Sequence, residues 1–344
     1  MRHGRPTEAV EIRDIAVPDV GAGAVRISVS AASLNFGDIA RCRGGIASVM
    51  IPPPFTLGMD VCGVVEDAGE GARDWLGRRV VGITTMALGG IADSALAPAH
   101  SVFDAPPELD DVEAAAFTLP FHVAYLALHT RARLVAGETV MVVGGAGGVG
   151  TAAVQLAVAA GADVIAVAGG DKGHICAQLG ASLVIDSTTD DIFDRVMTHT
   201  DGRGAEVVFD VVGGATTETT WTCVAREGRY LPVGFNGDPQ SGMTGRPLRK
   251  VATGNFSVVG VLLSYNQVPL QVRRAGLNPF PPASGALVHT ALCDLVARGA
   301  IRPAVGRRIR MDDVGIALED HEQRRTSGRT VVDVRHPPDA VGAS

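Results

Sequence analysis

The stretch that decides the fold runs from Glu138 to Lys172 and reads ETVMVVGGAGGVGTAAVQLAVAAGADVIAVAGGDK. It predicts a buried strand over 139–143, a glycine-rich turn, a helix of small residues and a second strand over 163–168. The turn has the pattern G-x-G-x-x-G, formed by Gly145, Ala146, Gly147, Gly148, Val149 and Gly150. Between a strand and a helix, such glycines permit a tight turn, close approach of backbone N–H groups to a diphosphate, and close helix–strand packing. The stretch therefore predicts a dinucleotide-binding turn.

An uncharged run over 139–162 leaves a membrane span as the alternative, but six glycines and Gln155 interrupt it.

The whole chain has 344 residues, of which 46% are hydrophobic and 19% charged, with a net charge of −7. This composition predicts a two-domain globular protein with no general affinity for nucleic acid or anionic membrane. No apolar segment follows the basic N-terminal residues, so we expect no secretory signal.

The five cysteines lie far apart and form no C-x-x-C pair, which argues against a zinc ribbon or a disulfide framework. A reduced, cytoplasmic setting fits this pattern, with the cysteines serving as small buried residues.

Residues 1–118 contain short β-type runs separated by glycine and proline, which predicts a β-rich domain. From about residue 120, strand-like and helix-like segments alternate, which predicts a doubly wound α/β fold with a parallel sheet. The predicted strands are 139–143, 163–168, 182–186, 206–212, 228–233 and 256–262.

After about residue 265 a proline-rich loop at 278–282 precedes a predicted helix over 286–298 and a short tail of strands ending near Val334. Residues 336–344 are expected to form a frayed terminus.

Several motifs in a fixed order resemble the medium-chain dehydrogenase/reductase superfamily, in its zinc-independent, zeta-crystallin-like quinone oxidoreductase branch. Besides the glycine turn, they are AASLNFGD at 31–38, PFTLGMDVCGVVE at 54–66, GGIAD at 89–93, LPF at 119–121 with Ala124 and Tyr125, DVVGG at 210–214, and Gly228-Arg229 through Gly234. The resemblance implies a GroES-like substrate domain formed by 1–118 and 265–344, with a Rossmann domain over 119–264 inserted in it. It also implies an active site in the cleft and a homodimer, with 256–262 as the pairing edge strand.

Zinc-dependent relatives carry ligands at positions that resemble Asn35, Met59 and Leu119 here. An amide, a thioether and an alkyl chain do not supply the ligands that catalytic zinc needs, so we expect no metal. Without a Lewis acid, conjugated acceptors such as quinones and α,β-unsaturated carbonyl compounds are favoured over simple ketones. Asn35 is the candidate catalytic hydrogen-bond donor; the alternative is an amide that holds its loop to Asp38.

The substrate pocket departs from the resemblance at one position, because Ala40 stands where many quinone oxidoreductases carry a tyrosine. Arg41 and Arg43 are candidates for charged residues at the mouth of the substrate pocket, although the simpler interpretation is that they are solvated arginines of a loop.

The second strand of the nucleotide fold ends in Ala168-Gly169-Gly170, without the acidic residue that binds the ribose hydroxyls of NAD. Lys172 stands at the position where members of the family carry a phosphate-binding lysine, so we predict NADPH as the cofactor. Two features count against NADPH. Asp171 lies next to Lys172 and would repel the phosphate, and Ser187 stands where the family often has a tyrosine. The resemblance further implies that Gly234 lies near the nicotinamide and Arg329 near the cofactor phosphates. His122, His174 and His289 each stand alone in the sequence, which favours packing or surface roles.

The leading hypothesis is an NADPH-dependent, zinc-free oxidoreductase that transfers hydride to a small-molecule quinone or enone. An enoyl-thioester reductase is the second hypothesis, since related modules share the fold and lack zinc. A third is a non-enzymatic NADPH-binding or RNA-interacting protein, for which the basic run of Arg302, Arg307, Arg308 and Arg310 is the sequence evidence. Aromatic residues make up only 4% of the chain, so no nucleic-acid partner is expected.

Overall fold

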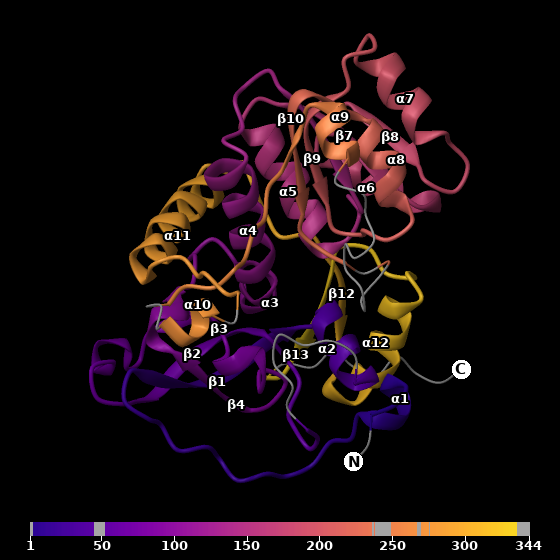
Figure 1. The fold of residues 1–344 in the computed structure, drawn as a ribbon. Helices are drawn as coiled ribbons and strands as arrows, with labels where there is room; N and C mark the ends of the chain where they lie inside the picture. The colour runs from indigo at the N-terminus through magenta and orange to yellow at the C-terminus, as the bar shows by residue number, and fades with distance from the viewer. Residues whose placement is uncertain are drawn as a thin grey trace.

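Two β-sheets of different construction organise the chain (Figure 1). The structure is a computed structural model, and it describes residues 3–44, 52–235, 237, 249–266, 270–274 and 276–335. The lower sheet in Figure 1 has the order β12-β13-β1-β2-β3-β5, with β4 paired to β1. Its strands are β1 (Ala24–Ser33), β2 (Asp60–Ala68), β3 (Arg79–Ile83), β4 (Ser94–Pro98), β5 (Val102–Asp104), β12 (Val305–Ile309) and β13 (Arg329–Asp333). The C-terminal strands therefore return to the N-terminal sheet.

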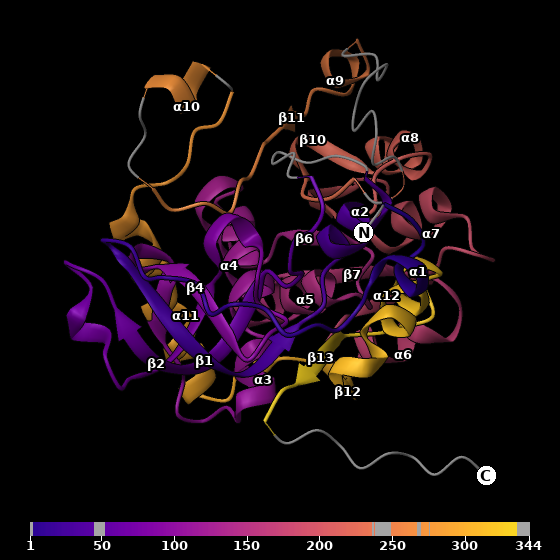
Figure 2. The ribbon, with the colours of Figure 1, turned by 90° about the horizontal axis from the view of Figure 1, so that it is seen from below.

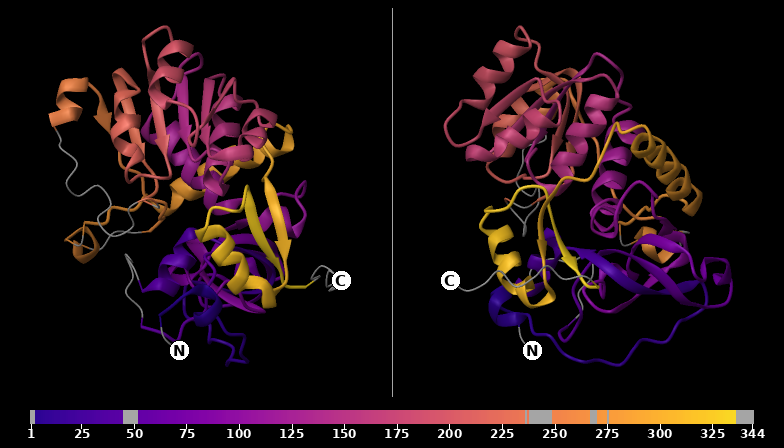
Figure 3. Two further views of the ribbon diagram at one scale, coloured as in Figure 1. Left: turned by 90° about the vertical axis from the view of Figure 1, so that its right-hand side faces the viewer. Right: turned by 180° about the vertical axis from the view of Figure 1, so that it is seen from behind.

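The upper sheet is parallel throughout and has the order β11-β10-β9-β6-β7-β8. Its strands are β6 (Thr139–Val143), β7 (Asp163–Ala168), β8 (Leu183–Asp186), β9 (Ala205–Asp210), β10 (Val224–Pro232) and β11 (Ser257–Val258). The connecting helices are α5 (Gly148–Ala159), α6 (Gly173–Gln178), α7 (Ile192–His199) and α8 (Thr216–Thr222), and Figure 3 shows them around the sheet. This strand order is that of a Rossmann fold.

The burial of β6 explains why its sequence is a continuous apolar run. All five of its residues are buried. Val140 and Val142 face one core cluster, which contains α5, while Met141 and Val143 face another, which contains α7 and α8. Because side chains alternate across a strand, both faces of the sheet are covered by helices. The predicted doubly wound α/β class is confirmed.

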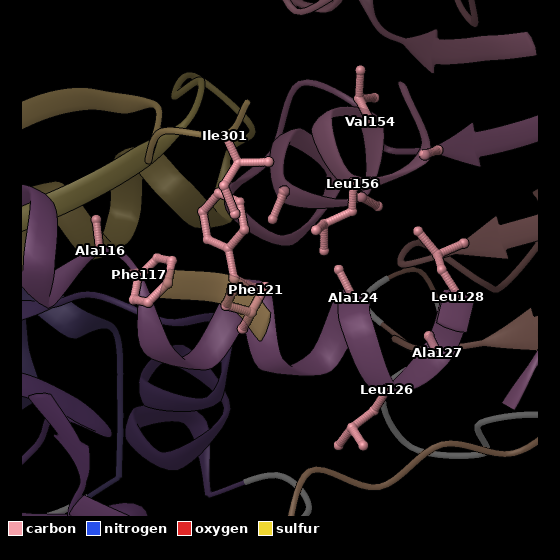
Figure 4. Packing of buried hydrophobic residues seen from close by; sticks show 14 of the residues in the cluster. Ala116, Phe117, Phe121, Ala124, Leu126, Ala127, Leu128, Val154, Leu156 and Ile301 are labelled. Atoms are coloured by element: carbon pink, nitrogen blue, oxygen red, sulfur yellow. The ribbon is translucent and has the colours of Figure 1, made fainter. Parts of the chain in front are cut away.

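Helix α4 (Thr118–Tyr125) begins where the β-rich N-terminal part ends and leads into the nucleotide fold. It continues into a π-helical turn over Leu126–Arg131 and packs on α5. Figure 4 shows Phe117 and Phe121 in the same cluster as Leu156 and Ile301. The remaining helices are α1 (Pro6–Ala9), α2 (Phe36–Arg43), α3 (Asp111–Ala115), α9 (Arg249–Gly254), α10 (Leu270–Arg274), α11 (Pro282–Ala297) and α12 (Val314–Glu322). α2, α12 and β13 lie on the side of the parallel sheet that Figure 2 turns toward the viewer.

Two expectations need correction. The predicted strand over 256–262 is wrong in extent, since only Ser257 and Val258 pair with β10. The C-terminal tail is not made of strands alone, because α12 lies between β12 and β13.

The predicted helix over 286–298 forms, although α11 already starts at Pro282. The domain boundaries near 118 and 265 stay a prediction, and the expected frayed terminus at 336–344 lies outside the described residues. Within the described ranges, no helix is long and apolar enough to cross a membrane.

Candidate functional site

The glycine turn joins β6 to α5 and leaves little room for side chains. A Cβ added to Gly150 would overlap the backbone of Gly144 and Gly145, whereas one on Gly147 would lie 3.4 Å from the Gly144 carbonyl oxygen. Gly147 is the N-cap of α5 and carries no side chain that could cap it. The first N–H groups of a helix have no acceptor within it, so they are available to an anion. The turn thus has the form that a diphosphate requires.

Strand β13 brings a residue of the other sheet directly against this turn. Gly147 and Gly328 form a parallel bridge, and the Gly328 N–H donates to the Ala146 carbonyl at 2.8 Å. A Cβ on Gly148 would overlap the side chain of Arg329. Arg329 therefore lies across the first turn of α5, although 181 residues separate it from Gly148 in the sequence.

The Arg329 guanidinium continues into a buried network with Asp60 and Asn35. It donates to the Asp60 carboxylate at 3.0 and 3.2 Å and to the Asn35 Oδ1 at 2.9 Å, while its Nε is buried without an acceptor. The Asn35 Nδ2 in turn donates to Asp60 at 2.8 Å and to the Ser33 carbonyl at 3.2 Å. Burial raises the pKa of Asp60, opposed by the Arg329 charge. The network joins β1, β2 and β13 beside the glycine turn.

Asn35 is placed at the N-terminus of α2, where its side-chain amide is engaged on both sides. Its backbone N–H donates to Asp38 at 2.9 Å, and the other Asp38 oxygen accepts the N–H of Gly58 at 3.0 Å. Asp38 is completely buried, and burial raises its pKa to about 6. The loop is therefore held to Asp38 by the backbone of Asn35, while the Asn35 side chain faces Asp60 and Arg329.

The three positions that resemble zinc ligands lie around this network. The Leu119 N–H donates to Asp60, and the Met59 sulfur lies 2.9 Å from where a Cβ on Gly37 would be. Among the described residues, no group of three His, Cys, Asp or Glu side chains is arranged to hold a metal ion.

Lys172 lies just beyond the C-terminal end of β7, across from the chain that precedes β13. Its Nζ donates to the Arg324 carbonyl at 2.6 Å. The nearest acid on the neighbouring strand, Asp186, accepts the Gly170 N–H at 2.9 Å and is also bound by Thr188. The Asp186 carboxylate at this edge of the sheet thus already has donors, and the charged residues in the turn after β7 are Asp171, which is exposed, and Lys172.

Gly234 follows β10 and lies against the end of β9. Its N–H donates to the Asp210 carbonyl at 3.1 Å, and a Cβ there would overlap the Val211 carbonyl. The Asp210 side chain accepts the Tyr230 hydroxyl at 2.5 Å and two backbone N–H groups. A side chain at position 234 has no room next to β9.

Two histidines that stand alone in the sequence meet in the fold, where both are buried. His122 of α4 bonds His289 of α11 at 3.2 Å and Tyr265 at 2.9 Å, and His289 bonds the Asp104 carbonyl at 2.8 Å. Burial lowers the pKa of both rings. Because a carbonyl only accepts, His289 carries its proton on Nε2, His122 donates to it, and Tyr265 donates to His122. His174 is exposed and bonds the Asp171 carbonyl.

The basic run at 302–310 is largely neutralised by acids. Arg302 pairs with Glu113 at 2.6 Å, Arg307 with Asp320 at 2.7 Å, and Arg308 with Asp333. A stripe of free cations, which RNA binding requires, is therefore missing from these three positions.

Of the two arginines predicted at the pocket mouth, Arg43 is engaged in an ion pair, whereas the Arg41 Nη1 is buried without a hydrogen-bond partner. Arg43 pairs with Glu322 of α12 at 2.6 Å, while Arg41 lies 3.9 Å from Asp38.

Comparison with known proteins places the chain in a family. The family model described as an alcohol dehydrogenase GroES-like domain matches residues 21–107, and the one described as a zinc-binding dehydrogenase matches 148–275. The chain is 31% identical over 309 residues to a quinone oxidoreductase of Lama guanicoe, covering 89% of this chain and 87% of that protein. The chain belongs to the medium-chain dehydrogenase/reductase superfamily. Within it, the chain falls in the quinone oxidoreductase branch.

Two further similarities bear on the chemistry. The solved structure of an Escherichia coli quinone oxidoreductase complexed with NADPH superposes with a TM-score of 0.81 at 25% identity, covering 96% of this chain and 98% of that one. A phthioceranic/hydroxyphthioceranic acid synthase of Mycobacterium tuberculosis is 34% identical over 231 residues, which is 65% of this chain and 11% of the synthase. The predicted GroES-like and Rossmann fold is confirmed by these matches and by the two sheets.

Proposed function

We propose that the protein is a zinc-independent, NADPH-dependent oxidoreductase that reduces quinones or α,β-unsaturated carbonyl compounds. One observation carries the proposal: the glycine turn lies directly against Arg329, which is bonded to Asp60 and Asn35. The turn that would bind the diphosphate therefore lies next to the Asn35 loop, which carries the reaction site in this family. The quinone oxidoreductase name of the Lama guanicoe relative and the NADPH in the Escherichia coli structure support it.

The residues around the turn fit a phosphorylated dinucleotide. The N–H groups at the start of α5 would hold its diphosphate, and Lys172 would hold the 2′-phosphate that distinguishes NADPH from NADH. Ala168, Gly169 and Gly170 leave space for that phosphate, and Gly234 would allow the nicotinamide to approach β9 and β10. When bound, the cofactor supplies a hydride for the conjugated acceptor, and the product takes its proton from solvent.

In this proposal Asn35 acts as a positioning residue. Its amide holds the Arg329 guanidinium and the Asp60 carboxylate in one arrangement, which fixes α2 relative to the glycine turn. Asn35, Met59 and Leu119 offer no set of zinc ligands, so substrate activation would rest on the conjugation of the acceptor and on positioning. This is the reason for naming quinones and enones ahead of simple ketones.

The test is NADPH consumption by the purified protein against 1,2- and 1,4-quinones, enals, enones and simple ketones, together with NADP⁺ reduction against alcohols. We expect turnover with at least one quinone or enone, and slower turnover with NADH. Reaction with simple ketones or alcohols alone would overturn the proposal.

The similarity to a segment of the phthioceranic acid synthase favours an enoyl-thioester reductase as the second candidate. Such an enzyme reduces the same conjugated carbon–carbon bond but on a thioester, so it needs the same cofactor site and a longer acyl channel. Crotonyl-thioesters belong in the same panel. Turnover of crotonyl-thioesters with none of quinones or enones would select this candidate over the first.

A further inference from the structure

His321, which the sequence did not single out, lies in α12 beside the proposed cofactor site. Its ring packs edge-on against Phe36, the residue after Asn35, with 6.4 Å between ring centroids. Phe36 is the first residue of α2, so His321 faces the same helix end as the Asn35–Asp60–Arg329 network. Three residues further along the chain, the Arg324 carbonyl accepts the Lys172 ammonium. His321 therefore lies where α2, α12 and the Lys172 turn meet.

The Nδ1 atom of this ring is buried and has no hydrogen-bond partner. A neutral imidazole bears one N–H and one bare nitrogen, and whichever of these is at Nδ1 is left unsatisfied. Leaving a buried polar atom without a partner costs about 1–3 kcal/mol, so such an atom needs an explanation. A group that is satisfied only when a ligand is present is one such explanation.

The charges that act on His321 from the neighbouring elements are cationic. Burial is the largest cause that lowers the pKa of His321, and Arg329 of β13 and Lys172 of the turn after β7 lower it further, so that together they bring the pKa to about 4.

Several other charged groups around α12 are paired with one another. Arg43 of α2 is bound by Glu322, Arg5 before α1 by Glu319, and Arg307 and Arg325 by Asp320. Without an anion, the imidazole thus stays neutral between two cations.

We propose that His321 takes up a proton when the phosphate groups of a dinucleotide bind at Lys172 and the glycine turn, so that cofactor binding is coupled to pH. This rests on the proposed function, since the ligand is the cofactor named there. An anion brought to the two cations offsets the part of the lowering of the pKa that Arg329 and Lys172 cause. The charged imidazolium then adds an attraction for the phosphates, which Gln or Asn at this position cannot supply.

The expected size of the coupling follows from the two pKa values. Burial, the largest cause of the low pKa, persists in the complex, so a bound anion raises the pKa of His321 from about 4 to at most its ordinary 6.5; at that upper limit the ring is almost fully protonated in the complex at pH 5.5 and neutral in the free protein. Binding is favoured by falling pH because the complex has the higher pKa. From pH 7.5 to pH 5.5 this raises the affinity by up to about tenfold, with uptake of up to roughly 0.9 proton per bound dinucleotide at pH 5.5.

The experiment is isothermal titration calorimetry of NADP⁺ into the full chain at pH 5.5 and pH 7.5, in two buffers of different ionisation enthalpy. The difference between buffers gives the protons taken up, independently of any turnover. His321→Gln removes the titrating ring, and His174→Gln serves as a matched control because His174 is an exposed histidine close to Lys172. The 2′-phosphate of NADP⁺ titrates in this range too, so the uptake assigned to His321, including its coupling to that phosphate, is the difference between wild type and His321→Gln.

We expect wild type and His174→Gln to take up more protons than His321→Gln at pH 5.5, by up to about 0.9 proton per bound dinucleotide. Equal uptake by wild type and His321→Gln, or loss of uptake in His174→Gln, overturns the inference while leaving the proposed function intact. Absence of NADP⁺ binding at pH 7.5 would overturn both. Should His321→Gln fail to fold, NMR titration of the wild-type histidines with and without NADP⁺ must still show one pKa rising from about 4.

Discussion

Replacing Arg329 with methionine should destabilise the protein strongly, because it leaves a buried charge without its counterion. The side chains of Arg329 and Asp60 are 5% and 0% exposed, and their closest atoms are 3.0 Å apart. Methionine keeps an unbranched chain that can pack on Gly148 but offers no charge. The Asp60 carboxylate would retain only the Asn35 amide and the Leu119 N–H as donors. Breaking a buried ion pair by removing one member costs about 3–5 kcal/mol.

The assay is urea denaturation at pH 7, followed by far-ultraviolet circular dichroism. Arg302→Met is the control, since Arg302 is also paired with a carboxylate but is 63% exposed, and its loss should cost about 1 kcal/mol or less. Adding Asp60→Asn to Arg329→Met should recover part of the loss, because no unpaired charge then remains. The reasoning is refuted if Arg329→Met and Arg302→Met lower the free energy of unfolding equally.

Three further predictions concern the glycine turn, the cofactor and the buried histidines. Gly150→Ala should lower the melting temperature because its Cβ overlaps backbone, whereas Gly147→Ala should fold normally and weaken NADPH binding; equal melting temperatures would contradict the difference in packing. Lys172→Ala should raise the Michaelis constant for NADPH by about tenfold or more, which is the effect of losing one hydrogen bond to a charged group, and leave the constant for NADH unchanged. An unchanged Michaelis constant for NADPH would refute the role of Lys172. Burial lowers the pKa of His122 and His289, so the stability they contribute is present above their ordinary value of 6.5 and is lost as pH falls below it. His122→Gln should therefore make the fall in unfolding free energy between pH 6 and 5 shallower by up to about 1.4 kcal/mol per pH unit, and an unchanged slope in urea titrations would count against the neutral histidine chain.

The parallel sheet was largely predictable because its strands are buried on both faces. Residues 139–143 and 163–168 form continuous apolar runs, and the strands have those bounds. The strand predicted over 256–262 is mostly absent, since only two of its residues pair with β10. Apolar composition alone does not supply a hydrogen-bonding neighbour, and Gly260 adds no side chain to pack.

The contacts within the candidate site were much less predictable than its motifs. The glycine pattern and Lys172 are local signals, whereas the bonds of Arg329 to Asn35 and Asp60 span 294 and 269 residues. His122 and His289 likewise meet only after α4 and α11 pack. An isolated histidine in a polar stretch, such as His321, carries no signal of burial until α12 is placed against α2. These features depend on tertiary packing, which residue spacing does not encode.

The most direct test of the account measures NADPH oxidation by protein dialysed against a metal chelator and shown by elemental analysis to be free of zinc. The account predicts that reduction of a quinone or enone continues at the rate of the undialysed protein, and that a secondary alcohol gives no reaction with NADP⁺. Loss of activity on dialysis with recovery on adding zinc would contradict it. So would turnover confined to alcohols and simple ketones.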